Sequence, residues 1–310
     1  MANVPVKLGR RRIIRVALET TQGSPIAPAT VELLCYDAKI QPDDNMIVRE
    51  PNGEYGGRAV SARGPATCTV TFTAELRGNG GTGLDAGLAV ALQGCGIKQT
   101  TLVYTPLTDV ASQKTITIDV WRDGHYERCY GAMGTFELAG EMGQRAMLNF
   151  TFSGLYAELT DEIVPTPSHT AMVPFRMAGG TLTLGTLSPK ISRFSLNPNN
   201  PVEPREDIDA DEGVGHYIIG PGRNWTVGMD PEDPAAATYD FRALWLALET
   251  AALSLLLTDG TTNVTIAAPV VQMMPPQEAL RDSKLVYELT GQCCSSAGDD
   301  EVTITTAAHT

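Results

Sequence analysis

Residues Thr67–Leu76 read TCTVTFTAEL and alternate without exception between polar and apolar side chains. A period of two is typical of a strand that buries one face and leaves the other face in water. The polar positions are Thr67, Thr69, Thr71, Thr73 and Glu75. We therefore expect a strand whose even positions, such as Val70 and Phe72, pack on a core, and whose threonine side stays open.

The same order of parts occurs twice in the chain. The strand is followed by the glycine-rich turn at 78–83 and by an apolar-faced helix from Leu84 to about Gly94. Further on, Arg223–Met229 alternates as a strand, and a second helix is expected from about Tyr239 to Thr250. A constant shift of 156 residues places Ile40 on Leu196, Pro42 on Pro198, Gly64 on Gly220, Pro65 on Pro221, Leu88 on Leu244, Ala91 on Ala247 and Leu92 on Leu248. We interpret this as an internal duplication.

The duplication predicts the domain organisation. We expect a first module at 1–160 with a basic N-terminal arm, a proline-rich linker at 161–180, and a second module at 181–310. After the helices the shift shrinks, and Leu148, Phe150 and Gly154 align with Leu285, Tyr287 and Gly291. Antiparallel meanders with one helix each predict a mainly β fold, a β-sandwich or partly closed barrel with a flanking helix. A chain of 310 residues is long enough for two such cores.

Composition excludes several classes of protein. The formal net charge of −13 and the pI near 4.7 argue against a broad basic surface that grips nucleic acid, but not against a surface that nucleic acid slides past. No apolar run has transmembrane length and no signal peptide is recognisable, so we expect no membrane insertion. The six cysteines show no metal-ligand spacing, and Cys68 is expected to be a buried free thiol.

Two long polar loops lie at matching places in the two copies, Gln41–Pro65 and Asn197–Arg223. Loops this long inside compact domains are usually functional or disordered, and their shared position favours a shared interaction role. Their charged and aromatic candidates are Asp43, Asp44, Arg49, Glu50, Glu54, Tyr55, Arg58, Arg63, Glu203, Arg205, Glu206, Asp207, Asp209, Asp211 and Glu212. The basic arm carries Lys7, Arg10, Arg11 and Arg12, which could touch phosphate, an acidic neighbouring subunit or only water.

An enzymatic interpretation rests on the turn at 78–83, which fits the G-x-G-x-x-G pattern between a strand and a helix. The preceding strand alternates with threonines, whereas a parallel dinucleotide-binding strand is apolar on both faces. The second copy replaces the glycines with the acidic turn Asp230–Pro234, which would repel pyrophosphate. The four histidines are scattered, and the pairs Asp43-Asp44 and Asp299-Asp300 are expected to be solvated loop ends. We therefore predict no enzyme, metal or cofactor.

The combined pattern resembles the tail tube (major tail) proteins of long, flexible-tailed bacteriophages. The residues that carry the resemblance follow in order along the chain: FTAELRG at 72–78, the helix at 84–95, LNFTFSGLY at 148–156, YDF at 239–241 and GDDE at 298–301. The resemblance implies a β-sandwich with a flanking helix, whose inner sheet joins neighbours into rings. The rings would stack into a hollow tube that DNA passes through.

The resemblance also implies partners and a location. Six modules per turn would come from three two-module chains, with a ring of six chains as the alternative. The threonine strand would form the tube wall around an acidic lumen that guides DNA during ejection, and the long loops would contact the adjacent ring. Tape measure, tail terminator and distal tail proteins are the expected partners, and the chain would be made in the host cytoplasm and end in the virion. The alternatives are a nucleotide-binding oxidoreductase and a non-viral tube or secreted β-sandwich protein.

Overall fold

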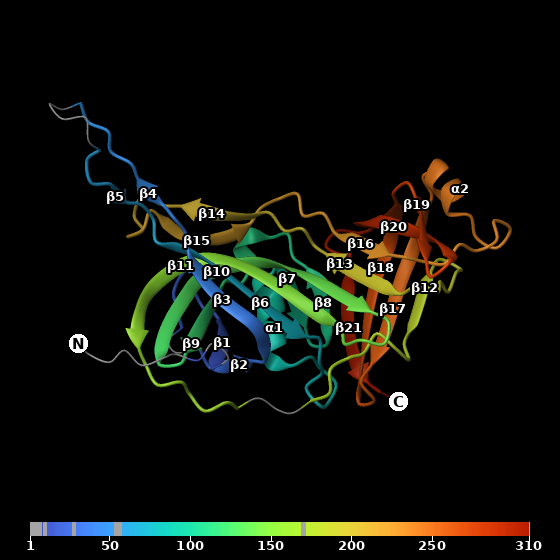
Figure 1. The fold of residues 1–310 in the computed structure, drawn as a ribbon, viewed down its shortest axis with the longest axis horizontal. Helices are drawn as coiled ribbons and strands as arrows, with labels where there is room; N and C mark the ends of the chain where they lie inside the picture. Colours follow the sequence, from blue (N-terminus) through green and yellow to red (C-terminus); the bar gives the residue numbers. More distant parts are fainter. Residues whose placement is uncertain (1–7, 9–10, 27–28, 53–57, 169–171, 310) are drawn as a thin grey trace.

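The computed structural model describes residues 8, 11–26, 29–52, 58–168 and 172–309 (Figure 1). Strands dominate the described residues, which also form two short α-helices. This confirms the mainly β prediction. The strands before the linker are β1 (Arg12–Leu18), β2 (Val31–Leu33), β3 (Cys35–Pro42), β4 (Met46–Ile47), β5 (Ala62–Arg63), β6 (Thr67–Glu75), β7 (Ile97–Thr100), β8 (Val103–Pro106), β9 (Ile116–Arg122), β10 (His125–Glu141) and β11 (Met147–Asp161).

The strands after the linker are β12 (Thr181–Leu184), β13 (Arg193–Asn197), β14 (Val202–Glu206), β15 (Val214–Ile219), β16 (Thr226–Met229), β17 (Thr250–Thr258), β18 (Thr262–Met273), β19 (Gln277–Arg281), β20 (Lys284–Cys294) and β21 (Thr303–Ala308). The dipeptide Asp123-Gly124 forms the hairpin turn that joins β9 to β10, and both residues have positive φ, as such turns require. Strand β10 is bent by a register shift between Tyr130 and Met133.

The strand β6 follows the predicted alternation along its middle. Cys68, Val70 and Phe72 are buried, and the threonines between them are half-buried. The prediction of an open polar face is wrong at its two ends, because Thr67 and Glu75 are buried. The Thr67 hydroxyl donates to Asp43, and Glu75 accepts from Tyr36 on β3 and from Arg145, so neighbouring residues cover both ends of the face.

Strand order repeats in the two halves of the chain. Before the linker the pairing order is β2, β1, β9, β10, β11, β6, β3, and after it the order is β12, β17, β18, β20, β16, β13, all antiparallel. The two orders match strand by strand: β1 corresponds to β12, β9 to β17, β10 to β18, β11 to β20, β6 to β16 and β3 to β13. The halves share hydrogen-bonded strands, because β10 pairs with β13 and β8 pairs with β21. These pairings do not close into a complete barrel.

Register corrects one part of the sequence alignment. Ile40 lies opposite Val70 in the first half, and Leu196 lies opposite Val227 in the second. On the next strand, Phe152 lies opposite Val70 and Gly291 lies opposite Val227. Gly291 therefore corresponds to Phe152, not to Gly154 as the sequence suggested. A slip of two residues keeps every side chain on its face, so the hydrophobic pattern could not detect it.

The two helices differ more than predicted. Helix α1 (Ala86–Gly94) is capped by Asp85 and buries Leu88 and Leu92 in the core. Helix α2 (Phe241–Leu246) is shorter than predicted, because Thr250 already begins β17. Leu248, the counterpart of Leu92, is 67% exposed. The apolar residues that follow Thr250 belong to strand β17 instead of the helix. The leucines shared by the two copies therefore predicted a longer second helix than the one that forms.

One hydrophobic core extends through both halves. It includes Phe72, Phe150 and Phe152, whose rings stack 5.1–5.8 Å apart, and Trp225 from the second half, which meets Phe136 edge to face. All six cysteines are free, and Cys68 is fully buried, as predicted. Within the described ranges, neither helix has the length and apolar composition needed to span a membrane.

Candidate assembly surfaces

A polar face runs across both halves on the central sheet. Opposite residues on neighbouring strands share a face, so one row can be followed through the register. This row is Glu75, Met147, Ala139, Ser195, Gly228 and Thr290. Next to it run Thr73, Asn149 and Glu137, and the row after that is Thr71, Thr151 and Thr135. The threonine face of β6 is thus one part of a longer surface, called here the wall face, that crosses from β3 to β20.

Small side chains make a groove in the wall face. Ala139, Ser195 and Gly228 line a depression of about 500 Å³ where β10, β13 and β16 meet. Its rim carries Arg193, which pairs with Glu288 at 2.5 Å, and Arg145, which pairs with Glu75 at 2.6 Å. Both pairs neutralise arginines, so the wall face presents hydroxyl groups, small or apolar side chains and carboxylates such as that of Glu137.

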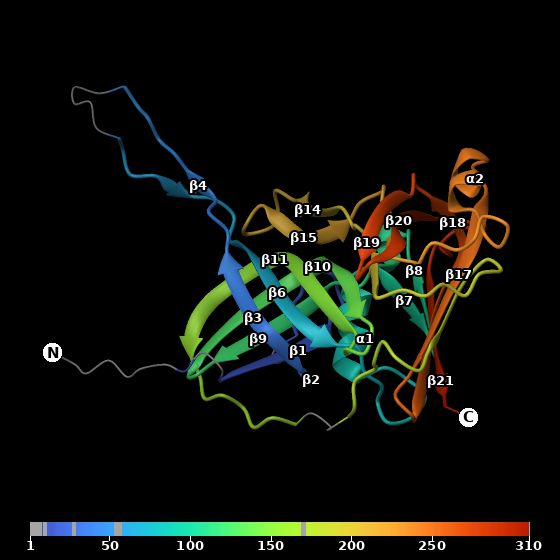
Figure 2. The same cartoon turned by 45° about the vertical axis from the view of Figure 1, so that its right-hand side comes forward.

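The first long loop forms an arm that extends away from the body, seen in Figure 1 and in the rotated view of Figure 2. Its base is held by Asn45, whose side chain donates to the Pro65 carbonyl and to the Thr67 hydroxyl, and by the β4–β5 pair. Asp43 belongs to this base, since it accepts hydrogen bonds from Thr67 and Thr69, and it is exposed.

The outer part of the arm is exposed. Arg49, Glu50 and Arg58 lie there, with Arg58 and Glu50 3.1 Å apart, and Asp44 is exposed near the base. The candidates Glu54 and Tyr55 lie outside the described residues. Four large apolar side chains on the arm are at least half exposed: Met46, Ile47, Val48 and Val60.

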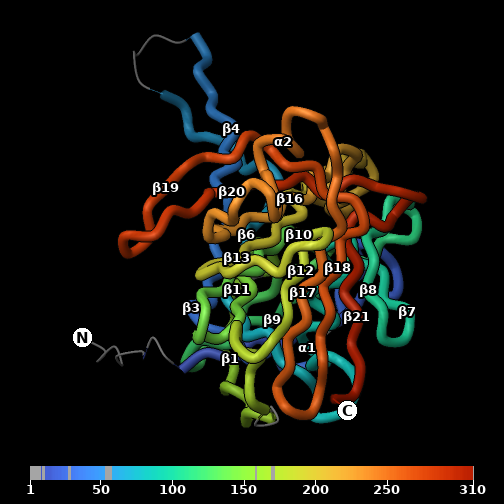
Figure 3. Tube along the Cα trace, turned by 90° about the vertical axis from the view of Figure 1, so that its right-hand side faces the viewer, coloured from blue at the N-terminus to red at the C-terminus, as the bar shows by residue number. Residues whose placement is uncertain are grey.

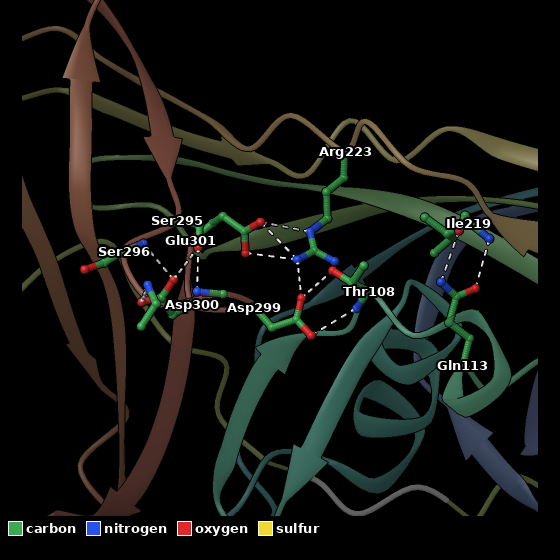
Figure 4. Close-up of polar contacts among 11 residues, drawn as sticks. Thr108, Gln113, Ile219, Arg223, Ser295, Ser296, Asp299, Asp300 and Glu301 are labelled. Carbon is green, nitrogen blue, oxygen red and sulfur yellow. Dashed lines mark hydrogen bonds and ion pairs between the residues drawn. The ribbon is translucent and has the colours of Figure 1, made fainter.

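The second long loop folds back onto the first half. Its hairpin, β14–β15, places Val214, Tyr217 and Ile219 against Met133 and Leu155 in a separate apolar cluster. Gln113 from the first half donates to the Ile219 carbonyl at 3.1 Å and accepts from its amide at 3.0 Å (Figure 4). The predicted charged candidates remain on the open side of this hairpin, where Glu203, Arg205, Glu206, Asp207, Asp209 and Asp211 are exposed.

Glu212 joins the two loops. It accepts the Ala66 amide at 2.8 Å and forms an ion pair with Arg63 at the base of the arm. The hydrogen bond from Ala66, reinforced by the Arg63 guanidinium, lowers the pKa of Glu212. The base of the arm is therefore tied to the second-half hairpin within one chain.

The described part of the basic arm makes contacts within its own chain. Arg11 pairs with Asp123 at 2.8 Å, and Arg12 donates to the Ala38 carbonyl. Lys7 and Arg10 lie outside the described residues.

An arginine joins the loop after β15 to the C-terminal segment. Arg223 binds Asp299 at 2.6 Å and Glu301 at 3.0 Å, and Asp299 also accepts the Thr108 amide of the first half (Figure 4). Partial burial raises the pKa of Asp299, but the hydrogen bonds from Thr108 and Arg223 outweigh it and hold that pKa below its ordinary value. Asp300 accepts the Ser296 and Ala297 amides. Neither aspartate is a merely solvated loop end, which corrects the prediction.

The glycine turn has no free phosphate cradle among the described residues. The Asn79 side chain already accepts the Gly81 and Gly83 amides, and Thr262 from the second half donates to the Gly81 carbonyl. Asp85 occupies the helix N-terminus, where a phosphate would bind in a dinucleotide fold. No group of three or more metal-ligating side chains gathers in the part of the chain that the structure describes.

Comparison with known proteins identifies the family of the chain. A family model described as "phage tail tube protein" matches residues 9–305. The chain belongs to the phage tail tube protein family. It is a structural component of a phage tail, and a structural family of this kind argues against an enzyme. No curated protein sequence matches the chain.

Several residues that hold this tail tube protein together were missed from its sequence. Gln113, Asn200 and Arg223 each link segments that are far apart in the sequence; Asn200 donates to the Cys95 and Gly134 carbonyls. The only available signal was the acidic run Gly298–Glu301, whose partner Arg223 carries the opposite charge. Charge alone could not identify that partner, because the chain offers 23 lysines and arginines.

The hairpin of this tail tube protein should loosen in mild acid. His216 on β15 is 6% exposed, and its Nε2 atom has no hydrogen-bond partner among the described residues. Burial, and then the charge of Arg205, lower the pKa of His216 below 6.5. Its contribution to stability is therefore complete above pH 6.5 and is lost as the pH falls through the lowered value, because the unfolded chain binds the proton more tightly.

Urea unfolding followed by circular dichroism from pH 7.5 to pH 5 would measure this effect. We expect His216→Gln to flatten the decline on the acid side. His125→Gln is the matched control, since the His125 side chain is 33% exposed, and it should leave the decline unchanged. An identical decline in the His216 variant would contradict the assignment.

Proposed function

We propose that three copies of this tail tube subunit form a ring, and that the rings stack into the hollow tube through which DNA passes during ejection. The observation that carries the proposal is the wall face, which continues from the first half into the second through the β10–β13 pair. A surface that is continuous within one chain can continue from chain to chain. The repeated strand order supports two equivalent modules per chain, and therefore six modules from three chains.

The wall face is suited to line the lumen. Its hydroxyl groups hydrate well, the Glu137 carboxylate repels phosphate, and two of its arginines are paired with glutamates. A net charge of −13 adds general repulsion of DNA. We infer that DNA slides past this face without adhering to it. Tape measure, terminator and distal tail proteins would bind the tube or its ends.

The arm is proposed to contact the adjacent ring. Exposed Ile47 and Val60 on a projecting hairpin would be covered in such a contact, which gives an apolar driving force. The base of the arm is fixed by Asn45 and by the Arg63–Glu212 pair, so the arm leaves the body in a defined direction. The acidic side of the β14–β15 hairpin is the second proposed inter-ring surface.

Shortening the arm tests the proposal. The variant deletes residues 48–61 and joins Ile47 to Ala62 through Asn-Gly, which keeps the β4–β5 pair and its turn geometry. We expect the subunit to stay folded, within about 0.5 kcal/mol of the parent in urea unfolding, because the described residues among those deleted lie outside the core. Negative-stain electron microscopy should show hollow stacked rings for the parent and no stacks for the variant.

Two results would count against these assignments. Full-length stacks from the shortened variant would remove the arm from the inter-ring contact. A parent chain that stays monomeric at every concentration and salt strength, in the presence of tail-tip initiator proteins, would contradict the tube function itself. The variant Val48→Ser/Val60→Ser is the matched control, and it should weaken stacking without abolishing it.

A further inference from the structure

The two halves of the chain are joined by a strand pair, β10–β13, that can serve as a model for a contact between two copies of the chain. The last residues of β10 lie antiparallel to β13, with Ala139 opposite Ser195 and Glu141 opposite Arg193. This pair joins the β3–β6–β11–β10 part of the central sheet to the β13–β16–β20 part. The chain thus contains one complete junction between a first half and a second half.

The counterparts of these two strands lie at the outer edges. By strand order and register, β3 holds the place of β13. The strand β19 corresponds to the last residues of β10. Each precedes a tight turn and pairs with the first residues of the strand that follows the turn: β19 pairs with β20, and the end of β10 pairs with β11. Among the described residues, β3 pairs only with β6, and β19 pairs only with β20.

We propose that β19 of one copy pairs with β3 of the next copy, antiparallel and in the register of the β10–β13 junction. The inference rests on the proposed ring and names the edges that close it. Transferring the register places Ala279 opposite Lys39. The register of β3 with β6 shifts between Tyr36 and Lys39, so the transfer applies from Lys39 onward. Arg281 is not needed for the junction, because it already pairs with Asp230 and Glu232 in its own chain.

The exposure of the β19 edge supports this partner. The β19–β20 hairpin projects from the body, as Figure 3 shows, and Leu280 on it is 74% exposed. A projecting two-stranded hairpin is only marginally stable by itself, and an open apolar edge strand is a template for pairing with another chain. On β3, Lys39 and Gln41 are exposed at the open edge, while Arg12 already donates to the Ala38 carbonyl. The pairing is therefore centred on Lys39–Gln41.

The junction joins copies head to tail. The two edges belong to opposite ends of the continuous strand order, so each copy offers β3 to one neighbour and β19 to the other. Such a head-to-tail contact generates a closed ring or an open filament, depending on the rotation between copies. Two modules per chain and six modules per turn close the ring at three copies.

Disulfide trapping in the full chain tests the register. The variant Lys39→Cys/Ala279→Cys, in a background with Cys35→Ser and Cys294→Ser, places two thiols opposite each other at a spacing that a disulfide spans. We expect oxidation to link up to three chains on a non-reducing gel, and no more. The linked fraction should exceed that of Lys98→Cys/Ala279→Cys by on the order of ten times, because pairing raises the effective concentration of the thiols. Lys98 lies exposed on β7, whose one described strand neighbour is β8.

A matched positive control uses the β10–β13 pair itself. Ala139→Cys/Ser195→Cys should form the same bond within one chain and give no linked chains. If stacked rings form but Lys39→Cys/Ala279→Cys does not link, the edge pairing is wrong and the tube function stands. Ladders longer than three chains would overturn closure at three copies. Absence of both rings and links would overturn the proposed function together with this inference.

Discussion

Replacing Trp225 with alanine is expected to lower the free energy of unfolding by about 3–5 kcal/mol. The Trp225 side chain is 2% exposed and lies just before β16 in the second half. Its ring meets Phe136 of the first half edge to face at 5.8 Å, and Phe136 in turn contacts Phe150. Removing the indole leaves a cavity between the halves, where strands on both sides prevent collapse.

Trp225→Phe is the matched control. The indole Nε1 atom has no hydrogen-bond partner among the described residues, so phenylalanine removes a buried donor that the described contacts do not satisfy. We expect a cost of about 1 kcal/mol from the lost volume. Urea unfolding followed by circular dichroism separates the two variants. If Trp225→Ala lowered the free energy of unfolding by less than Trp225→Phe does, the stability of the two halves would not depend on this contact.

The second large effect is expected at Asp119. This carboxylate on β9 is fully buried and accepts hydrogen bonds from the Ala29 amide at 2.7 Å, the Tyr126 hydroxyl at 3.0 Å and the Arg128 Nε atom at 2.7 Å. Asp119→Ala leaves Arg128, with a 14% exposed side chain, without this counter-ion. Breaking one side of a buried ion pair costs about 3–5 kcal/mol.

The double variant Asp119→Ala/Arg128→Met identifies the cause. If the cost comes from the stranded charge, the double variant should unfold at a higher urea concentration than Asp119→Ala alone. Asp119→Asn keeps the shape, loses the charge, and should cost about 1–3 kcal/mol. Additive effects of the two single changes in the double variant would contradict the coupling between Asp119 and Arg128.

The local elements were readable from sequence where one pattern dominated. The strand β6 and the hairpin at Asp123-Gly124 follow from period-two alternation and from turn chemistry, which act over a few residues. The length of the second helix was not predicted correctly. Leu244 and Leu248 fit a helix pattern, but the helix ends at Leu246 and the neighbouring run from Ala251 pairs with β18. Tertiary pairing overrode local propensity there.

The candidate surfaces were only partly readable. Both long loops were located by length and polarity, but their different roles were not visible in composition. The arm projects, whereas the second loop packs on Met133 and Leu155. The second loop packs because Val214, Tyr217 and Ile219 form an apolar side, and the arm has no apolar residues at the corresponding positions. Those apolar residues were in the sequence, yet the surface that receives them is formed by a strand bulge far away in the chain.

The sequence by itself determined the mainly β class, the position of the threonine strand, and the family, because periodicity and ordered short motifs are local properties of the chain. The tertiary structure alone decided that β10 pairs with β13, that Arg223 meets Asp299, and that a single wall face crosses both halves. Such contacts join residues more than fifty positions apart, and many strands could satisfy the same alternation. The choice among them depends on burial and register summed over the whole fold, which no short segment encodes.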